Sequence, residues 1–169
     1  MELYEKKYID FFDAIANLSQ TLTKDPRPKI ILNSLLISEI FNAYTRSEFK
    51  YWKRYIVPAL PTHEKPSKKI EDLDYKTDYR KEDHFDKAVK TFTSDLLAHQ
   101  DYIELYDDGA NKLDVFSMLE SFPANTDFND YYYYLFCHEH NLSLVTNDSD
   151  FLYADIDIIT NNGKLLKHK

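Results

Sequence analysis

Short apolar runs alternate with longer amphipathic segments along this chain, and that alternation constrains its fold more than any other feature. The short runs predict strands at 29–33, 102–106, 142–146 and 156–160. Between them, apolar residues recur at spacings of three and four, which predicts helices over 4–23, 35–55, 79–99, 113–119 and 127–140. Strands alternating with helices are typical of a parallel sheet covered by helices. We therefore predict an α/β fold, a three-layer α/β/α sandwich with a mainly parallel sheet.

Two stretches show neither the short apolar runs expected of strands nor the three- and four-residue spacing expected of helices. Residues 58–75 contain three prolines and many charges, so we predict a mobile loop there. Residues 161–169 begin with a turn and continue as a basic tail. The sequence has no internal repeat and no low-complexity linker, and its 169 residues suit a single domain spanning 1–169.

Composition excludes several classes of protein. The chain has only two glycines, so it cannot form a Gly-rich phosphate-binding loop. No apolar run is long enough to cross a membrane, and the charged start at Met1 leads into no apolar signal core. The single cysteine, Cys137, cannot form an internal disulfide, which fits a reducing compartment. We therefore expect a cytoplasmic protein with no membrane partner.

The net charge of −8 argues against high-affinity, non-specific binding of nucleic acid. It does not argue against an enzyme that holds phosphates through a divalent metal ion. Local positive charge also exists, at Lys50, Lys53 and Arg54 and again around residues 65–69.

Three acidic residues follow predicted strands or begin predicted helices. Glu39 lies in the helix after the first strand, Asp130 lies in the first turn of the helix 127–140, and Asp148 follows the strand 142–146. Ligands of parallel α/β sheets bind at the carboxyl ends of the strands. Carboxylates are hard oxygen ligands of the kind that Mg²⁺ and Mn²⁺ favour. If the three converge, a bound cation would relieve their repulsion and activate a water for attack on phosphate.

Each acid also has a purely structural interpretation. Asp127 suits an N-cap, and Asp130 suits an acid stabilised by the helix dipole. Asp148 is also a typical turn residue, and Glu39 suits a solvated position on a helix.

Two segments carry a resemblance to a known family. The segment Asn33-Ser-Leu-Leu-Ile-Ser-Glu39 resembles the strand end and Glu-bearing helix of PIN-domain proteins. The segment from Asp130 to Phe151, which ends in Thr146-Asn-Asp148-Ser-Asp150-Phe, resembles the family's Asp-initiated helix and following strand. PIN domains are typically metal-dependent ribonucleases, and many small bacterial members are toxins of toxin–antitoxin pairs.

The resemblance implies hydrolysis of RNA phosphodiester bonds by a metal-activated water. It implies Mg²⁺ or Mn²⁺ bound by Glu39, Asp130 and Asp148, with Asp150 at the rim. Thr146 would orient a carboxylate or a water. Apart from the resemblance, the basic, Pro-rich segment 50–69, which includes Lys50, Lys53 and Arg54, could contact RNA phosphates, and a solvated loop is the alternative. RNA is the implied substrate and an antitoxin the implied protein partner, and a homodimer is left open.

The chain departs from the family at its start. The family begins with a central strand that ends in a principal metal-ligating Asp, whereas here the first predicted element is a helix. Asp10 and Asp13 lie inside that helix and cannot take the missing role. We therefore expect a PIN-like sheet that lacks its first central strand, unless the coding sequence upstream of Met1 supplies it. A PIN-like module that binds RNA or protein without catalysis is the alternative function.

Other chemical groups favour structural roles. His138 and His140 are two residues apart on a predicted helix, so their side chains diverge and do not form a zinc site. Cys137 has no neighbouring base and is expected to be a buried thiol. The run Tyr131–Tyr134 could stack on bases, but packing in the core or an interface is the favoured role.

Overall fold

The computed structural model describes residues 3–22, 27–109, 113–124, 126–151, 153 and 155–167. The chain divides into two compact units. We call residues 21–106 the hairpin unit, and residues 1–20 together with 107–169 the terminal unit. The prediction of a single domain spanning 1–169 stays a prediction.

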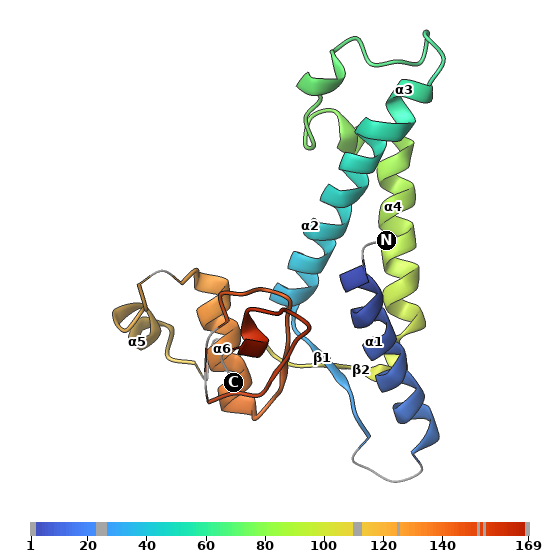
Figure 1. Cartoon of the computed structure of the whole chain (residues 1–169). Coiled ribbons are helices and arrows are strands. Elements are labelled where there is room, and N and C mark those ends of the chain that lie inside the picture. Colours follow the sequence, from blue (N-terminus) through green and yellow to red (C-terminus); the bar gives the residue numbers. More distant parts are fainter. Residues whose placement is uncertain are drawn as a thin grey trace. The chain divides into compact units, whose positions relative to one another are not determined.

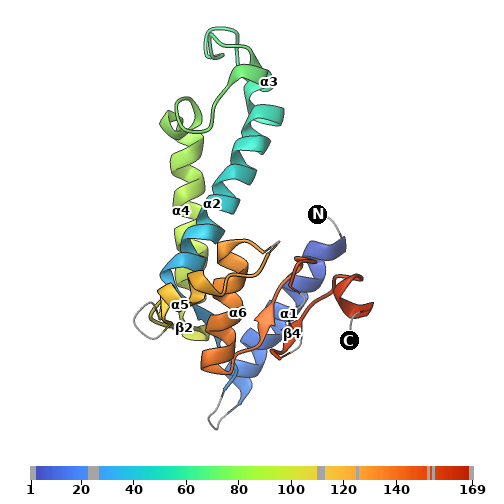
Figure 2. The same cartoon turned by 90° about the vertical axis from the view of Figure 1, so that its left-hand side faces the viewer.

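Two long helices dominate the hairpin unit. Helix α2 (Ser34–Tyr51) and helix α4 (Asp83–Ala98) lie side by side and contact each other (Figures 1 and 2). Strands β1 (Ile30–Leu32) and β2 (Ile103–Leu105) lie at the ends of this pair and form a two-stranded parallel sheet, with Ile30 opposite Ile103. The whole α2–α4 hairpin is thus the crossover between two parallel strands.

A side chain caps the start of α2. The N-cap is Asn33, whose side-chain oxygen accepts a hydrogen bond from the Leu36 N–H at 2.8 Å. Ser34 is the first helical residue. Asn at this position satisfies a backbone donor that has no partner within the helix.

The predicted helix 35–55 continues past α2 with a change of geometry. A π-helical turn, η1 (Trp52–Ile56), follows α2 directly, and the short helix α3 (Val57–Ala59) follows η1. The Val57 N–H bonds to the Trp52 carbonyl, five residues earlier. Pro58 has no N–H to donate, so the regular α-helical ladder cannot continue through this point.

The segment predicted as a mobile loop, 58–75, differs from that description at its carboxyl end. It contains the 3₁₀ turn η2 (Ile70–Asp72), and the two residues Leu73 and Tyr75 that follow are buried. A second 3₁₀ turn, η3 (Tyr79–Lys81), leads into α4, and a third, η4 (Gln100–Tyr102), leads out of it. The buried core of the hairpin unit consists of Trp52, Val57, Leu73, Tyr75 and Tyr79.

The terminal unit contains the remaining elements. Helix α1 (Leu3–Thr21) belongs to it as far as residue 20. The later elements are α5 (Val115–Glu120), α6 (Phe128–His140), β3 (Leu144–Val145), β4 (Ile158–Ile159) and η5 (Leu165–Lys167). Strands β3 and β4 pair in parallel, with Leu144 opposite Ile158. Leu165 is buried, so the predicted basic tail is packed at this residue.

The fold is therefore α/β in composition, with helices and short parallel strands, and both strand pairs have the predicted parallel direction. Among the described residues the strands form two separate two-stranded sheets. None of the described helices has the length and apolar character that crossing a membrane requires.

Candidate functional site

The start of α6 places two of the acidic residues. Asp127 is the N-cap, and its carboxylate accepts a hydrogen bond from the Asp130 N–H at 2.9 Å. The capping interpretation of Asp127 is thus confirmed. Asp130 is half-buried in the first turn, where the helix dipole stabilises negative charge.

A second set of polar side chains lies in the turn after β3. The Thr146 hydroxyl accepts a hydrogen bond from the Asp148 N–H at 3.0 Å, and Asp148 Oδ1 accepts one from the Asp150 N–H, also at 3.0 Å. These bonds make 146–150 a pair of overlapping side-chain turns and fix the Asp148 carboxylate in place. The turn interpretation of Asp148 is confirmed, and its exposed carboxylate stands at the carboxyl end of a parallel strand.

Aromatic packing connects this turn to α6. Phe151, the next residue, is 4% exposed, and the Tyr153 ring stacks on that of Tyr134 with centroids 4.0 Å apart. Burial raises the pKa of the Tyr153 phenol, and the negative charges of Asp130 and Asp127 raise it further. Tyr153 therefore lies within electrostatic reach of the acidic start of α6.

A polar pocket of about 520 Å³ lies toward the other end of α6. Tyr134 donates a hydrogen bond to Asp155 Oδ2 at 2.7 Å, which is the main cause that raises the pKa of Tyr134 to about 12. His138 Nε2 lies 3.8 Å from the same oxygen. Cys137 is 6% exposed, and burial raises its pKa to about 11, so the expectation of a buried thiol is confirmed.

Glu39 belongs to the hairpin unit. It is half-buried in the second turn of α2, the helix that follows β1. Because Asp130 and Asp148 belong to the terminal unit, and each unit is described by itself, convergence of the three carboxylates stays a prediction. Among the residues that the structure describes, no three His, Cys, Asp or Glu side chains are grouped so that they could hold a metal ion.

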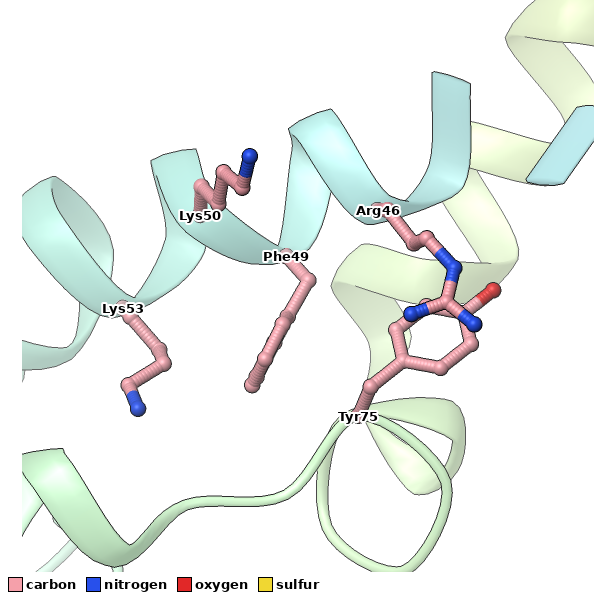
Figure 3. Close-up of a pocket in the computed structure, with 5 residues that line it drawn as sticks. All are labelled: Arg46, Phe49, Lys50, Lys53 and Tyr75. Carbon is pink, nitrogen blue, oxygen red and sulfur yellow. The ribbon is translucent and has the colours of Figure 1, made fainter. Parts of the chain in front are cut away.

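The predicted substrate-binding cations lie on α2 and η1. Lys50 and Lys53 line an open pocket of about 510 Å³, whereas Arg54, one residue further along, does not line it. We call this the basic pocket; Figure 3 shows its lining residues: Arg46, Phe49, Lys50, Lys53 and Tyr75.

Sequence reasoning missed three members of the basic pocket. Arg46 and Phe49 precede Lys50 and Lys53 at the three- and four-residue spacings of one helix face, so periodicity could have revealed them. Tyr75 lies in a segment without periodicity, and nothing in its local sequence indicates that it returns to α2.

Charge is distributed unevenly between the two units. The hairpin unit has 15 Lys and Arg against 14 Asp and Glu, whereas the terminal unit has 6 against 15. The net charge of −8 therefore arises entirely in the terminal unit, the unit that contains Asp130, Asp148 and Asp150.

Comparisons with known protein families, with curated proteins and with solved structures gave no match to this chain. The resemblance to PIN domains therefore depends on the two sequence segments and on the positions of their acidic residues.

Proposed function

We propose that this protein is a metal-dependent endoribonuclease of the PIN type, which hydrolyses RNA phosphodiester bonds with Mg²⁺ or Mn²⁺. The observation that carries the proposal is the turn at 146–150. It holds the Asp148 carboxylate by hydrogen bonds just beyond the end of a parallel strand, in the unit that also holds Asp130 at a helix start.

The donor set suits the proposed ion in kind. Carboxylate oxygens are the preferred protein ligands of Mg²⁺ and Mn²⁺. Glu39, Asp130 and Asp148 would hold the cation, and Asp150 would contribute at the rim. When bound, the cation would supply a water of lowered pKa as the nucleophile.

The chain's own residues would prepare the site before the cation arrives. The Thr146 hydroxyl and the Asp150 N–H hold the Asp148 backbone and carboxylate in one orientation. Such preorganisation lowers the entropic cost of ordering a metal-ligating side chain when the ion binds. Asp127, by capping α6, would hold the helix turn that carries Asp130.

The finer features of the family belong to the same proposal. They include the three-layer sandwich, the missing first central strand and a role as the toxin of a toxin–antitoxin pair. The described residues 3–22 are helical apart from the last, so they supply no strand that ends in a metal-ligating Asp.

Cleavage of RNA tests the proposal. The full chain is incubated with a fluorescently labelled single-stranded RNA and MnCl₂, and products are resolved on a denaturing gel. We expect cleavage that requires Mn²⁺ and that Glu39→Gln or Asp148→Asn abolishes. Glu139→Gln, which changes an exposed acid on α6, is the matched control and should cleave normally. Unchanged cleavage by the Glu39→Gln, Asp148→Asn double variant would refute the site.

A PIN-like module that binds RNA or protein without catalysis is the second candidate. The observation that favours it is that no three metal-ligating side chains are grouped among the described residues, whereas the basic pocket has three cations. RNA binding without cleavage at any Mn²⁺ concentration would select this alternative.

A further inference from the structure

The basic pocket forms where one face of a helix meets a returning segment. Arg46, Phe49 and Lys50 lie on the last turns of α2, and Lys53 lies on η1. Tyr75 comes from the segment after η2 (Figure 3). All five lining residues belong to the hairpin unit, so the pocket is complete within one compact unit.

The pocket is positively charged. Three of its lining residues are cations and none is acidic. Within the part of the chain that the structure describes, Arg46, Lys50 and Lys53 form no ion pair with a carboxylate. Their charges are therefore available to an anion from outside, on a chain whose overall charge is −8.

Two of the cations are held in position by neutral groups. Lys53 Nζ donates to the backbone carbonyls of Glu71 and Leu73, at 3.2 Å each, and lies 5.3 Å from the centre of the Phe49 ring. The Arg46 guanidinium lies 5.3 Å from the centre of the Tyr75 ring. Carbonyls and aromatic rings orient these side chains without cancelling their charge.

The pocket also has an aromatic surface. Figure 3 shows the Phe49 ring projecting between Lys53 on one side and Arg46 with Tyr75 on the other. Phe49 is half-buried against the aromatic core and contributes apolar surface to the pocket. A volume of about 510 Å³ lies in the range of small-molecule sites. The combination suits a ligand with a negative group next to a flat apolar one, such as a nucleotide.

The positive charge extends along the helix beyond the pocket. Arg46, Lys50 and Arg54 follow at intervals of four along α2 and η1, and Figure 3 shows the Arg46 and Lys50 side chains extending in different directions from the helix. The π-helical turn of η1 interrupts regular α-helix geometry between Lys50 and Arg54, and such turns are frequent at functional sites. A ligand with repeated negative charges could therefore continue from the pocket toward Arg54.

We propose that the basic pocket is a docking site for single-stranded RNA, with one nucleotide in the pocket and the neighbouring phosphate on Arg54. Single-strand binding sites combine cations that follow the backbone with aromatic surfaces for the bases, and this pocket has both. The inference deepens the proposed function, since it names the surface that holds the RNA strand. RNA binding here does not depend on the metal site, so the two proposals can fail separately.

Fluorescence anisotropy of a 5′-labelled 12-nucleotide oligouridylate tests the site. The full chain is titrated in EDTA, which removes divalent metal and prevents metal-dependent cleavage. Lys50→Glu is the test variant, because Lys50 is exposed and forms no ion pair among the described residues. Lys90→Glu, at an exposed position on α4, makes the same change in net charge away from the pocket.

We expect Lys50→Glu to weaken RNA binding at least 10-fold and Lys90→Glu to change it less than 2-fold. The dependence of log affinity on log salt should also become shallower in Lys50→Glu, because fewer phosphates are neutralised. Far-UV circular dichroism verifies that both variants are folded.

Equal affinity of the two variants for RNA would overturn the proposal. So would an acidic peptide, such as a labelled hexaglutamate flanked by leucines, that binds in a Lys50-dependent manner while the RNA does not bind. Lys50-dependent RNA binding by a chain that never cleaves RNA would contradict the proposed function and leave this docking site intact. Mn²⁺-dependent cleavage together with RNA binding that Lys50→Glu leaves unchanged would support the proposed function and overturn the docking site.

Discussion

The hairpin unit and the terminal unit each contain one short parallel strand pair, but they differ in how polar groups are arranged around it. The hairpin unit buries aromatic rings in one core and presents cations beside them. The terminal unit has an excess of acids, and several of its carboxylates lie at helix starts and turns, where backbone N–H groups bind them. Under the proposed function, the hairpin unit would hold the RNA, and the terminal unit would supply Asp130 and Asp148, two of the three proposed carboxylate ligands.

Truncating a side chain in the buried core of the hairpin unit should destabilise the protein more than truncating one on its surface. Trp52 is 2% exposed, and its ring centroid lies 5.3 Å from that of Tyr79 and 6.2 Å from that of Phe49. Trp52→Ala removes this packing and leaves a cavity, so we expect a loss of about 3–5 kcal/mol in the free energy of unfolding. Urea denaturation followed by circular dichroism measures it. Leu97→Ala, at a position that is 58% exposed, should cost far less.

A similar loss for both variants would show that the aromatic cluster is not the stabilising core of this unit. It would also mean that this cluster does not hold Phe49 and Tyr75 in place beside the cations.

The reaction rate of the Cys137 thiol, in the terminal unit, should show the next largest effect. Because burial raises the pKa of Cys137 to about 11, little thiolate exists at pH 8. We expect its reaction with a disulfide reagent in the native protein to be slower than in the urea-unfolded chain by roughly 100-fold from the pKa alone. The absorbance change on reaction measures both rates. Equal rates would mean that this end of α6 opens freely to solvent.

One buried hydrogen bond links the hairpin helix to the returning segment. Thr45 Oγ1 and the Tyr75 hydroxyl lie 2.6 Å apart, and Thr45 is fully buried. Tyr75→Phe deletes this bond while keeping the ring, so we expect a loss of about 1 kcal/mol in unfolding free energy. Tyr55→Phe, at a 52% exposed ring, should have no measurable effect. RNA affinity should survive Tyr75→Phe, since Arg46 contacts the ring and not the hydroxyl.

The cap of α6 distinguishes the structural role of Asp127 from the metal-binding role proposed for Asp130. Asp127→Ala removes the side-chain acceptor of the Asp130 N–H and should cost about 1 kcal/mol of unfolding free energy. Asp127→Ser keeps an acceptor and should restore most of that loss. If Asp127→Ser recovers stability and not Mn²⁺-dependent cleavage, Asp127 itself would be a ligand, and the assignment of Asp130 would need revision.

Local patterns in the sequence predicted most of the secondary structure. The helix periodicity and the capping role of Asp127 were read correctly, because both depend on residues within one or two turns of each other. The parallel direction of both strand pairs was also predicted. Helices α2 and α4 form the crossover between β1 and β2, whereas the described residues between β3 and β4 form no helix. Burial of Leu73 and Tyr75 was missed because it depends on a return to α2 across a segment without periodicity.

The candidate sites likewise include residues that local sequence could place and residues that depend on distant parts of the chain. Asp148 could be placed in a turn because its partners, Thr146 and Asp150, are two residues away on either side. Lys50 and Lys53 could be identified as a basic cluster, but the pocket they line needs Tyr75, which is more than 20 residues away in sequence. The position of Glu39 relative to Asp130 depends on the packing of two units, which no local pattern encodes.

Isothermal titration of Mn²⁺ into the full-length chain tests the central claim most directly. The account predicts a saturable binding event in the wild-type protein that Asp148→Asn removes and Glu139→Gln retains. Heats that are identical in the wild-type and Asp148→Asn proteins would contradict the proposed carboxylate site.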